Sequence, residues 1–77
     1  MKPGQFFRHE DGKMIATIGE AKSFMFGDLL VVEELNPIGH SIIEAGAKLD
    51  GGWVEIGKPE WLREVRRVST LKVVGHG

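Results

Sequence analysis

The alternation of apolar and polar residues divides the chain into short strands that are separated by turn-forming residues. The most apolar stretch is Phe24–Glu34, in which Leu29–Val32 are four apolar residues in a row. A strand with such a run has both faces buried, which is typical of an inner strand of a sheet. We therefore expect the strand Leu29–Leu35 to lie between two other strands.

A β-hairpin is predicted near the N-terminus, with strands at Gln5–His9 and Lys13–Ile18. Asp11-Gly12 between them is a strong hairpin signal, because a type I′ turn needs positive φ at both central residues. In the return strand Ile15 interrupts the alternation of apolar and polar positions. We therefore expect the second face of this strand to be partly covered.

Three further strands are predicted after the inner one. They are His40–Glu44, Trp53–Ile56 and Val68–Val74. We interpret Gly19–Ser23 as a polar connection and Gly27 as a bulge or tight turn before the inner strand. Pro59 suits the first position of a helix, and Glu60 suits its dipole. One or two helical turns are therefore expected over residues 59–67, with a strand as the alternative.

These elements predict a mainly β fold: a small SH3-like barrel, or an open β-sheet of five to six short strands, with one short helical turn near residues 59–67. Turn signals recur roughly every 8–12 residues, which is typical of small all-β domains. The segment 24–74 resembles SH3-like barrels in outline. In those barrels a Gly-Asp enters a central strand, a Trp-containing strand follows a tight turn, and a helical turn precedes the last strand. Gly27-Asp28, Trp53 and Pro59–Val65 occupy these places, and the resemblance implies a fold but no function.

Composition narrows the class of protein. A chain of 77 residues predicts a single small domain, residues 1–77, with a small core. The absence of cysteine excludes disulfides and fits a reducing, cytoplasmic location. The longest apolar run has four residues, so we expect no membrane span and no secretion signal. Formal net charge is -1, but residues 1–57 carry five Lys/Arg and nine Asp/Glu, whereas residues 58–77 carry five and two.

Side chains that serve catalysis or metal binding elsewhere stand in no recognisable pattern here. His9, His40 and His76 lack ligand spacing, and no serine lies in a nucleophile motif. The candidate acids are Asp28, Glu33, Glu34, Glu44 and Glu55. Their default place is a solvated face, with Glu44 and Glu55 as an alternative cross-strand pair. We therefore expect no enzyme, no metal site and no cofactor.

Aromatic residues in so small a core are expected to be mostly buried, with Trp53 inside it and Trp61 at its rim. Adjacent strand residues face opposite ways, so Phe7 or Phe6 is expected to face outward, and Met25 to face away from both its phenylalanine neighbours. An exposed apolar group of this kind marks a docking surface. On a helix, Arg63, Arg66 and Arg67 form one stripe, either solvated and paired with glutamates or open to an anion.

The function predicted from these features is a non-catalytic protein-interaction module: an adaptor, an inhibitor or an assembly subunit of a larger complex, viral complexes included. The residues predicted to contact the partner are Phe7, Met25, Trp61, Arg63, Arg66 and Arg67. The alternative is a small nucleic-acid-binding protein that uses the basic C-terminal segment, which the overall charge disfavours. Both a monomer closed by the Gln5–His9 strand and a homodimer paired through Val68–Val74 are consistent with the pattern, and closure is favoured because it needs no second chain.

Overall fold

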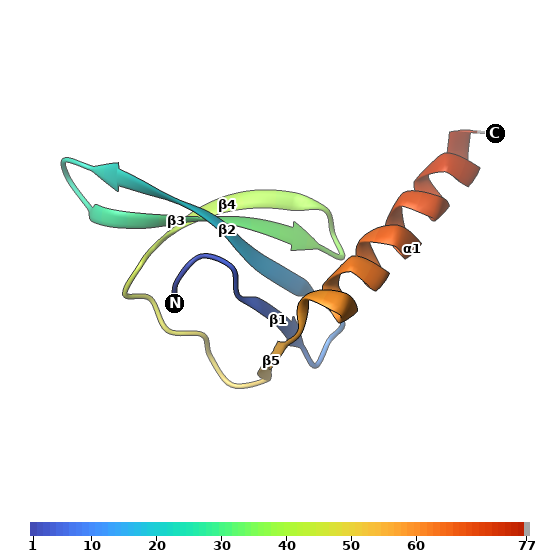
Figure 1. The fold of residues 1–77 in the computed structure, drawn as a ribbon, viewed down its shortest axis with the longest axis horizontal. Coiled ribbons are helices and arrows are strands. Elements are labelled where there is room, and N and C mark those ends of the chain that lie inside the picture. The colour runs from blue at the N-terminus through green and yellow to red at the C-terminus, as the bar shows by residue number, and fades with distance from the viewer. Residues whose placement is uncertain (77) are drawn as a thin grey trace.

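The computed structural model describes the backbone of residues 1–76 and the side chains of residues 1–69. Within that range it contains five strands and one helix (Figure 1). The elements are β1 (Phe6–His9), β2 (Met14–Ser23), β3 (Gly27–Leu35), β4 (Gly39–Glu44), β5 (Trp53–Ile56) and α1 (Lys58–His76). The strands form one antiparallel sheet in the order β4-β3-β2-β1-β5. The mainly β prediction is confirmed in its open-sheet form, because β4 and β5 are the two edges of this sheet and do not pair to close a barrel.

The inner position of β3 is confirmed. This strand pairs with β2 on one side and β4 on the other. Leu30 and Val32 are 1% and 2% exposed, while Leu29 and Val31 on the opposite face are half-buried. The run of four apolar residues therefore corresponds to a strand that is covered on both faces, one face more completely than the other.

The predicted β1–β2 hairpin is present, but the predicted type I′ turn is wrong. Only Gly12 of this turn has a positive φ, of 99°, and Asp11 does not. The His9 N–H donates to the Lys13 carbonyl at 2.7 Å, and the Gly12 N–H donates to the His9 carbonyl at 2.9 Å. This pattern is a three-residue loop that ends in a left-handed glycine, the next most common hairpin connection.

Strand β2 is longer than the sequence pattern predicts. The polar connection expected at Gly19–Ser23 is wrong, because these residues pair with the beginning of β3. Ladder hydrogen bonds with a neighbouring strand stabilise a polar segment that has little apolar surface of its own. The pairing register shifts between Thr17 and Gly19, and Ile18 at this bulge is 51% exposed.

Both faces of the sheet carry an apolar cluster. On one face the buried residues are Phe7, Ile15 and Val32, with Met1, Ile43, Leu49 and Trp53 partly buried around them. On the other face they are Met14, Ala16, Leu35 and Trp61, with Phe6, Ile56 and Val65 around them. Because α1 covers the second face, both members of the Phe6-Phe7 pair are packed, and neither is left outward in solvent. The expected cover on both faces of β2 is confirmed at Ile15, which is 6% exposed.

Helix α1 spans 19 residues, so the predicted one or two turns were too short. The predicted last strand, Val68–Val74, is wrong, because this segment is the continuation of α1. The edge expected there, and the homodimer built on it, disappear with the strand. No Gly or Pro interrupts residues 60–74, and extending an existing helix by one residue is far easier than starting a new element. This outweighs the strand preference of the valines.

The two tryptophans exchange the environments predicted for them. Trp61 is 5% exposed and packs on Phe6 with ring centroids 5.8 Å apart, so its predicted place at the rim is wrong. Trp53 is only half-buried, against the His9 ring at 4.9 Å. The reason is that β5 lies at an edge of the sheet, whereas the first turns of α1 lie across its face.

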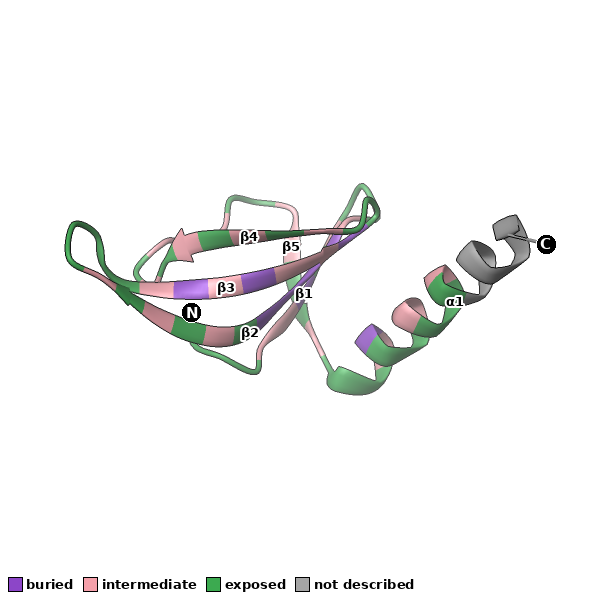
Figure 2. Cartoon of the chain, turned by 90° about the horizontal axis from the view of Figure 1, so that it is seen from above, coloured by how far each residue is buried: buried purple, intermediate pink, exposed green. Residues whose placement is uncertain are grey.

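The molecule is elongated, with extents of 45 × 25 × 19 Å. The β2–β3 hairpin projects at one end and α1 at the other (Figure 1). Burial is concentrated between these projections, where β1, β2 and β3 run together (Figure 2). Across the described residues, no helix combines the length and the hydropathy that crossing a bilayer requires.

Candidate functional site

Three consecutive large apolar side chains are exposed at the end of the β2–β3 hairpin. We call residues 19–31 the arm and Phe24, Met25 and Phe26 the tip. The tip residues are 111%, 84% and 62% exposed, so Phe24 stands away from the rest of the protein altogether. Burying a side chain of this kind is worth about 1.5–3 kcal/mol, so the tip holds apolar surface that the fold leaves unused.

The backbone of the tip is held by its two flanking residues. The Ser23 hydroxyl oxygen accepts the N–H of Met25 at 3.1 Å and the N–H of Phe26 at 3.2 Å. Gly27 closes the turn with φ of 75°, a conformation that side chains with a Cβ rarely adopt. Short hydroxyl-to-backbone bonds of this type define turns. The tip therefore presents its side chains from a defined turn.

The polar residues of the arm give it a slight negative charge. Glu20, Lys22 and Asp28 sum to one positive and two negative charges, or -1. Lys22 and Asp28 lie opposite each other across the strands, just behind the tip. A hollow of about 240 Å³ beside the tip is lined by Lys22, Ser23 and Phe24. The arm thus combines an apolar tip with two strands whose net charge is weakly negative.

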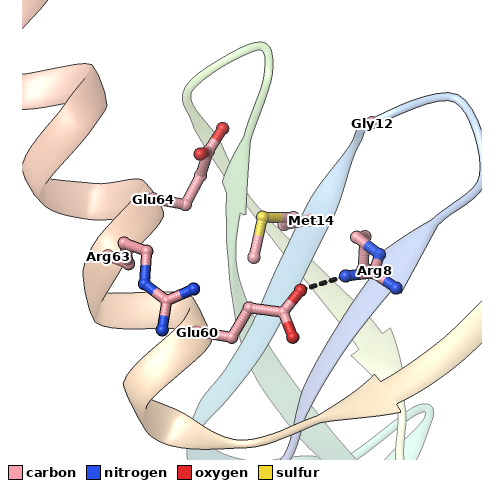
Figure 3. Close-up of a pocket in the computed structure, with 6 residues that line it drawn as sticks. All are labelled: Arg8, Gly12, Met14, Glu60, Arg63 and Glu64. Carbon is pink, nitrogen blue, oxygen red and sulfur yellow. Dashed lines mark hydrogen bonds and ion pairs between the residues drawn. The ribbon is translucent and has the colours of Figure 1, made fainter.

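A second concave feature lies at the opposite end of the molecule, between α1 and the β1–β2 hairpin (Figure 3). This cleft of about 310 Å³ is lined by Arg8, Gly12, Met14, Glu60, Arg63 and Glu64. The guanidinium of Arg8 pairs with the carboxylate of Glu60 across it. Two guanidiniums and two carboxylates line the cleft together, so their formal charges cancel.

The carboxylate of Glu64 is committed to structural bonds. Arg67 donates to it at 2.9 and 2.6 Å, and the Asn36 amide donates at 2.7 Å. The hydrogen bonds from Arg67, followed by that from Asn36, lower the pKa of Glu64 to about 2. The group is therefore ionised at neutral pH and ties α1 to the β3–β4 turn. A carboxylate in this state is unsuited to general acid catalysis.

The predicted contact residues are scattered over the fold. Burial removes Phe7, 8% exposed, and Trp61, 5% exposed, from any docking surface. Met25 is exposed in the tip, as the prediction requires. All three arginines of the basic stripe are exposed on α1, and Arg67 is also bonded to Glu64 and Asn36.

Two apolar residues of the tip, Phe24 and Phe26, are absent from the predicted contact set. The prediction treated residues 24–26 as strand, which would bury the two phenylalanines on one face. The sequence did contain a signal for a turn: a serine and a glycine enclose three residues between two strands. Ser23 and Gly27 are both turn-forming types.

The described side chains contain no group of three or more His, Asp or Glu arranged to hold a metal ion. Glu44 and Glu55, considered as a cross-strand pair, lie on β4 and β5 at opposite edges of the sheet, so that pairing is wrong. No family model matches the chain, and neither the curated proteins nor the solved structures contain a match.

Proposed function

We propose that this chain is a non-catalytic protein-interaction module that docks on a larger protein by inserting its tip into an apolar pocket. The observation that carries this proposal is the exposure of Phe24, Met25 and Phe26 side by side. Contiguous exposed apolar surface marks interaction sites, and aromatic residues and methionine are enriched in them. An adaptor, an inhibitor and an assembly subunit would all use the surface in this way.

The geometry of the tip favours a concave partner. Aromatic side chains have few rotatable bonds, so little conformational entropy is lost when they are immobilised. The bonds from Ser23 and the left-handed Gly27 further reduce what must be ordered on binding. A narrow projection of this shape suits a pocket better than a flat face.

The charge of the arm favours a protein over an anionic membrane. Basic residues beside an apolar insertion are what draws a protein to an acidic lipid surface. Here the only cation among the charged residues of the arm is Lys22, and it faces Asp28. With a net charge of -1, the arm gains nothing from anionic headgroups.

A comparative pull-down tests the proposal. The tagged chain, a Phe24→Ser/Phe26→Ser variant and an Ile38→Ser control are incubated with nuclease-treated lysate. Ile38 is the matched control because it is 59% exposed and also lies in a turn between two strands. We expect the parent and the control to capture the same protein, and the tip variant to bind it at least about thirty-fold more weakly, the size of a typical hot-spot loss.

Three outcomes contradict the proposal. Equal capture by the tip variant shows that the tip is not the contact. Capture that disappears with nuclease favours the alternative, nucleic-acid binding by the basic segment; an Arg63→Ser/Arg66→Ser variant then weakens it. Tip-dependent sedimentation with anionic vesicles, and no captured protein, points to a membrane. The internal bonds of Arg67 and the overall charge of -1 make the nucleic-acid alternative the weaker one.

A further inference from the structure

The outer edge of β4 has no neighbour among the described strands. β4 pairs with β3 on one side and stands at the end of the strand order. His40, Ile42 and Glu44 share one face of it and are exposed, with Ile42 62% exposed. Sheet edges are usually protected by Lys, Pro or a bulge, and β4 has neither Lys nor Pro and pairs with β3 without a register shift.

The backbone of β4 is oriented for pairing at this edge. The Ala45 N–H donates to the Asp28 carbonyl, toward β3, at 3.0 Å. Backbone groups in an antiparallel strand alternate between its two sides. The N–H and C=O groups of residues 40 and 42 and the N–H of residue 44 therefore point outward, away from β3. The Glu44 carbonyl accepts the Ala47 N–H at 3.0 Å.

The pleat limits how a second copy of β4 can pair with the first. Directly opposed residues must lie on the same face, so the two-fold axis passes through a residue and not between two. Centring on Ser41 sets His40 against Ile42, and centring on Ile43 sets Glu44 against Ile42. Centring on Ile42 sets Ile42 against its own copy and His40 against Glu44 on both sides of it.

We propose that two copies of this chain associate through antiparallel pairing of β4 with β4, centred on Ile42. Only this register is complementary in both respects, apolar against apolar and imidazole against carboxylate. Val31 lies beside Ile42 on β3 and is half-buried, so the seam becomes a row of four apolar side chains across the two sheets. This association is independent of the partner docking proposed for the tip.

The charges across the seam support one another. Within one copy His40 lies 3.8 Å from Glu33, its cross-strand neighbour on β3. In the dimer, Glu44 of the second copy approaches the same imidazole from the other side. The His40 imidazole then lies between two carboxylates, and the two-fold axis repeats this arrangement.

Sedimentation velocity over a wide range of protein concentrations tests whether the chain dimerises through the β4 edge. We expect a concentration-dependent dimer for the parent and a monomer for Ile42→Lys, because two lysines then oppose each other at the axis. Val54→Lys is the matched control, since Val54 is 55% exposed on β5, the other edge strand. A parent that stays monomeric up to about 1 mM overturns the proposal, as does a dimer that survives Ile42→Lys.

Mixing two variants tests the register. Glu44→Lys alone removes the imidazole–carboxylate contacts, and His40→Glu alone sets carboxylates against one another. Each should weaken the dimer roughly ten-fold because two pairs are lost. In the mixed dimer the two introduced charges, which are opposite in sign, face each other, and the remaining native His40 faces the remaining native Glu44. This dimer should therefore regain the affinity of the parent. A mixture that associates no better than either variant alone excludes the Ile42-centred register.

Cross-linking detects the dimer even when the association is weak. The chain has no cysteine, so Ile42→Cys introduces a single thiol. A short bismaleimide should join two copies of this variant and leave a Val54→Cys control uncoupled. Equal coupling of the two variants contradicts pairing through β4.

Discussion

Single side chains hold the backbone at the places where the strands leave their regular course. Thr17, 1% exposed, donates its hydroxyl to the Lys2 carbonyl at 2.6 Å and accepts the Gln5 N–H at 2.9 Å. These bonds fasten the N-terminal segment to β2 next to its bulge. Ser23 holds the tip in the same manner, through backbone N–H groups that no strand can satisfy.

The carboxylate of Glu64 predicts a pH-dependent contribution to stability. Its pKa falls from 4.5 to about 2 on folding, so its stabilising effect is present above pH 4.5 and disappears as the pH falls toward 2. Arg67 is about half exposed and solvent screens the pair. We therefore expect Glu64 to contribute about 0.5–1 kcal/mol to the free energy of unfolding.

The measurement is the free energy of unfolding of the parent and of Glu64→Gln between pH 7 and pH 2. The parent should be more stable by that amount at pH 7, and the difference should vanish near pH 2. Arg67→Gln should remove the same pH dependence. A difference that stays constant over this range contradicts the assigned role of Glu64.

At the scale of elements, the sheet is completed by a helix that touches it mainly through its first turns. Trp61 and Val65 pack on Met14, Ala16 and Leu35, and the Arg8–Glu60 and Glu64–Asn36 contacts lie beside them. Most of the stability of a helix in a protein comes from the packing of its apolar face and not from helix propensity. Packing on the sheet therefore decides whether α1 forms.

Trp61→Ala should remove most of this support. We expect the free energy of unfolding to fall by about 3–5 kcal/mol, comparable with the whole stability of a small domain. The helical signal at 222 nm should be lost at the same time. Leu62→Ala is the control, because Leu62 is the next residue in α1 and 45% exposed, and should cost about 0.5 kcal/mol. Denaturant titrations monitored by circular dichroism compare the two variants. Equal losses would mean that the helix is held by a different face.

At the scale of the whole molecule, the buried apolar clusters and the exposed apolar tip are separated along the long axis. The two apolar clusters lie in the middle of the sheet, while the tip lies at one end, remote from both (Figure 1). Neither cluster includes a residue of the tip. The stability of the fold therefore does not depend on the side chains of Phe24, Met25 and Phe26.

Replacing all three tip residues by serine should leave the fold unchanged. We expect the free energy of unfolding to stay within about 0.5 kcal/mol of the parent, the usual range for surface substitutions. Thermal and urea unfolding measure this, and binding of a hydrophobic dye should fall at the same time. A loss of roughly 2 kcal/mol or more, well outside the surface range, would show that the tip packs on the body, and would remove the basis for docking through it.

Local pattern alone located all five strands of the sheet, but it also predicted a sixth strand at Val68–Val74, which is helical. The run Leu29–Val32 identified the inner strand, Ile15 revealed cover on the second face of β2, and Asp11-Gly12 located the first hairpin. These predictions depend on the period of apolar residues and on turn-forming types, which are properties of neighbours in sequence. Strand alternation also predicts an exposed Met25, but Met25 is exposed because residues 24–26 form a turn in which Phe24 and Phe26 are exposed as well.

Only the tertiary structure decided which apolar side chains are covered. Trp61 is buried because α1 crosses the sheet, Val68–Val74 is helical because it extends that helix, and Phe24 and Phe26 are exposed because their turn lies beyond both clusters. The edge at β4 likewise follows from the strand order. Burial depends on contacts between residues distant in sequence, and the pattern along the chain does not contain them.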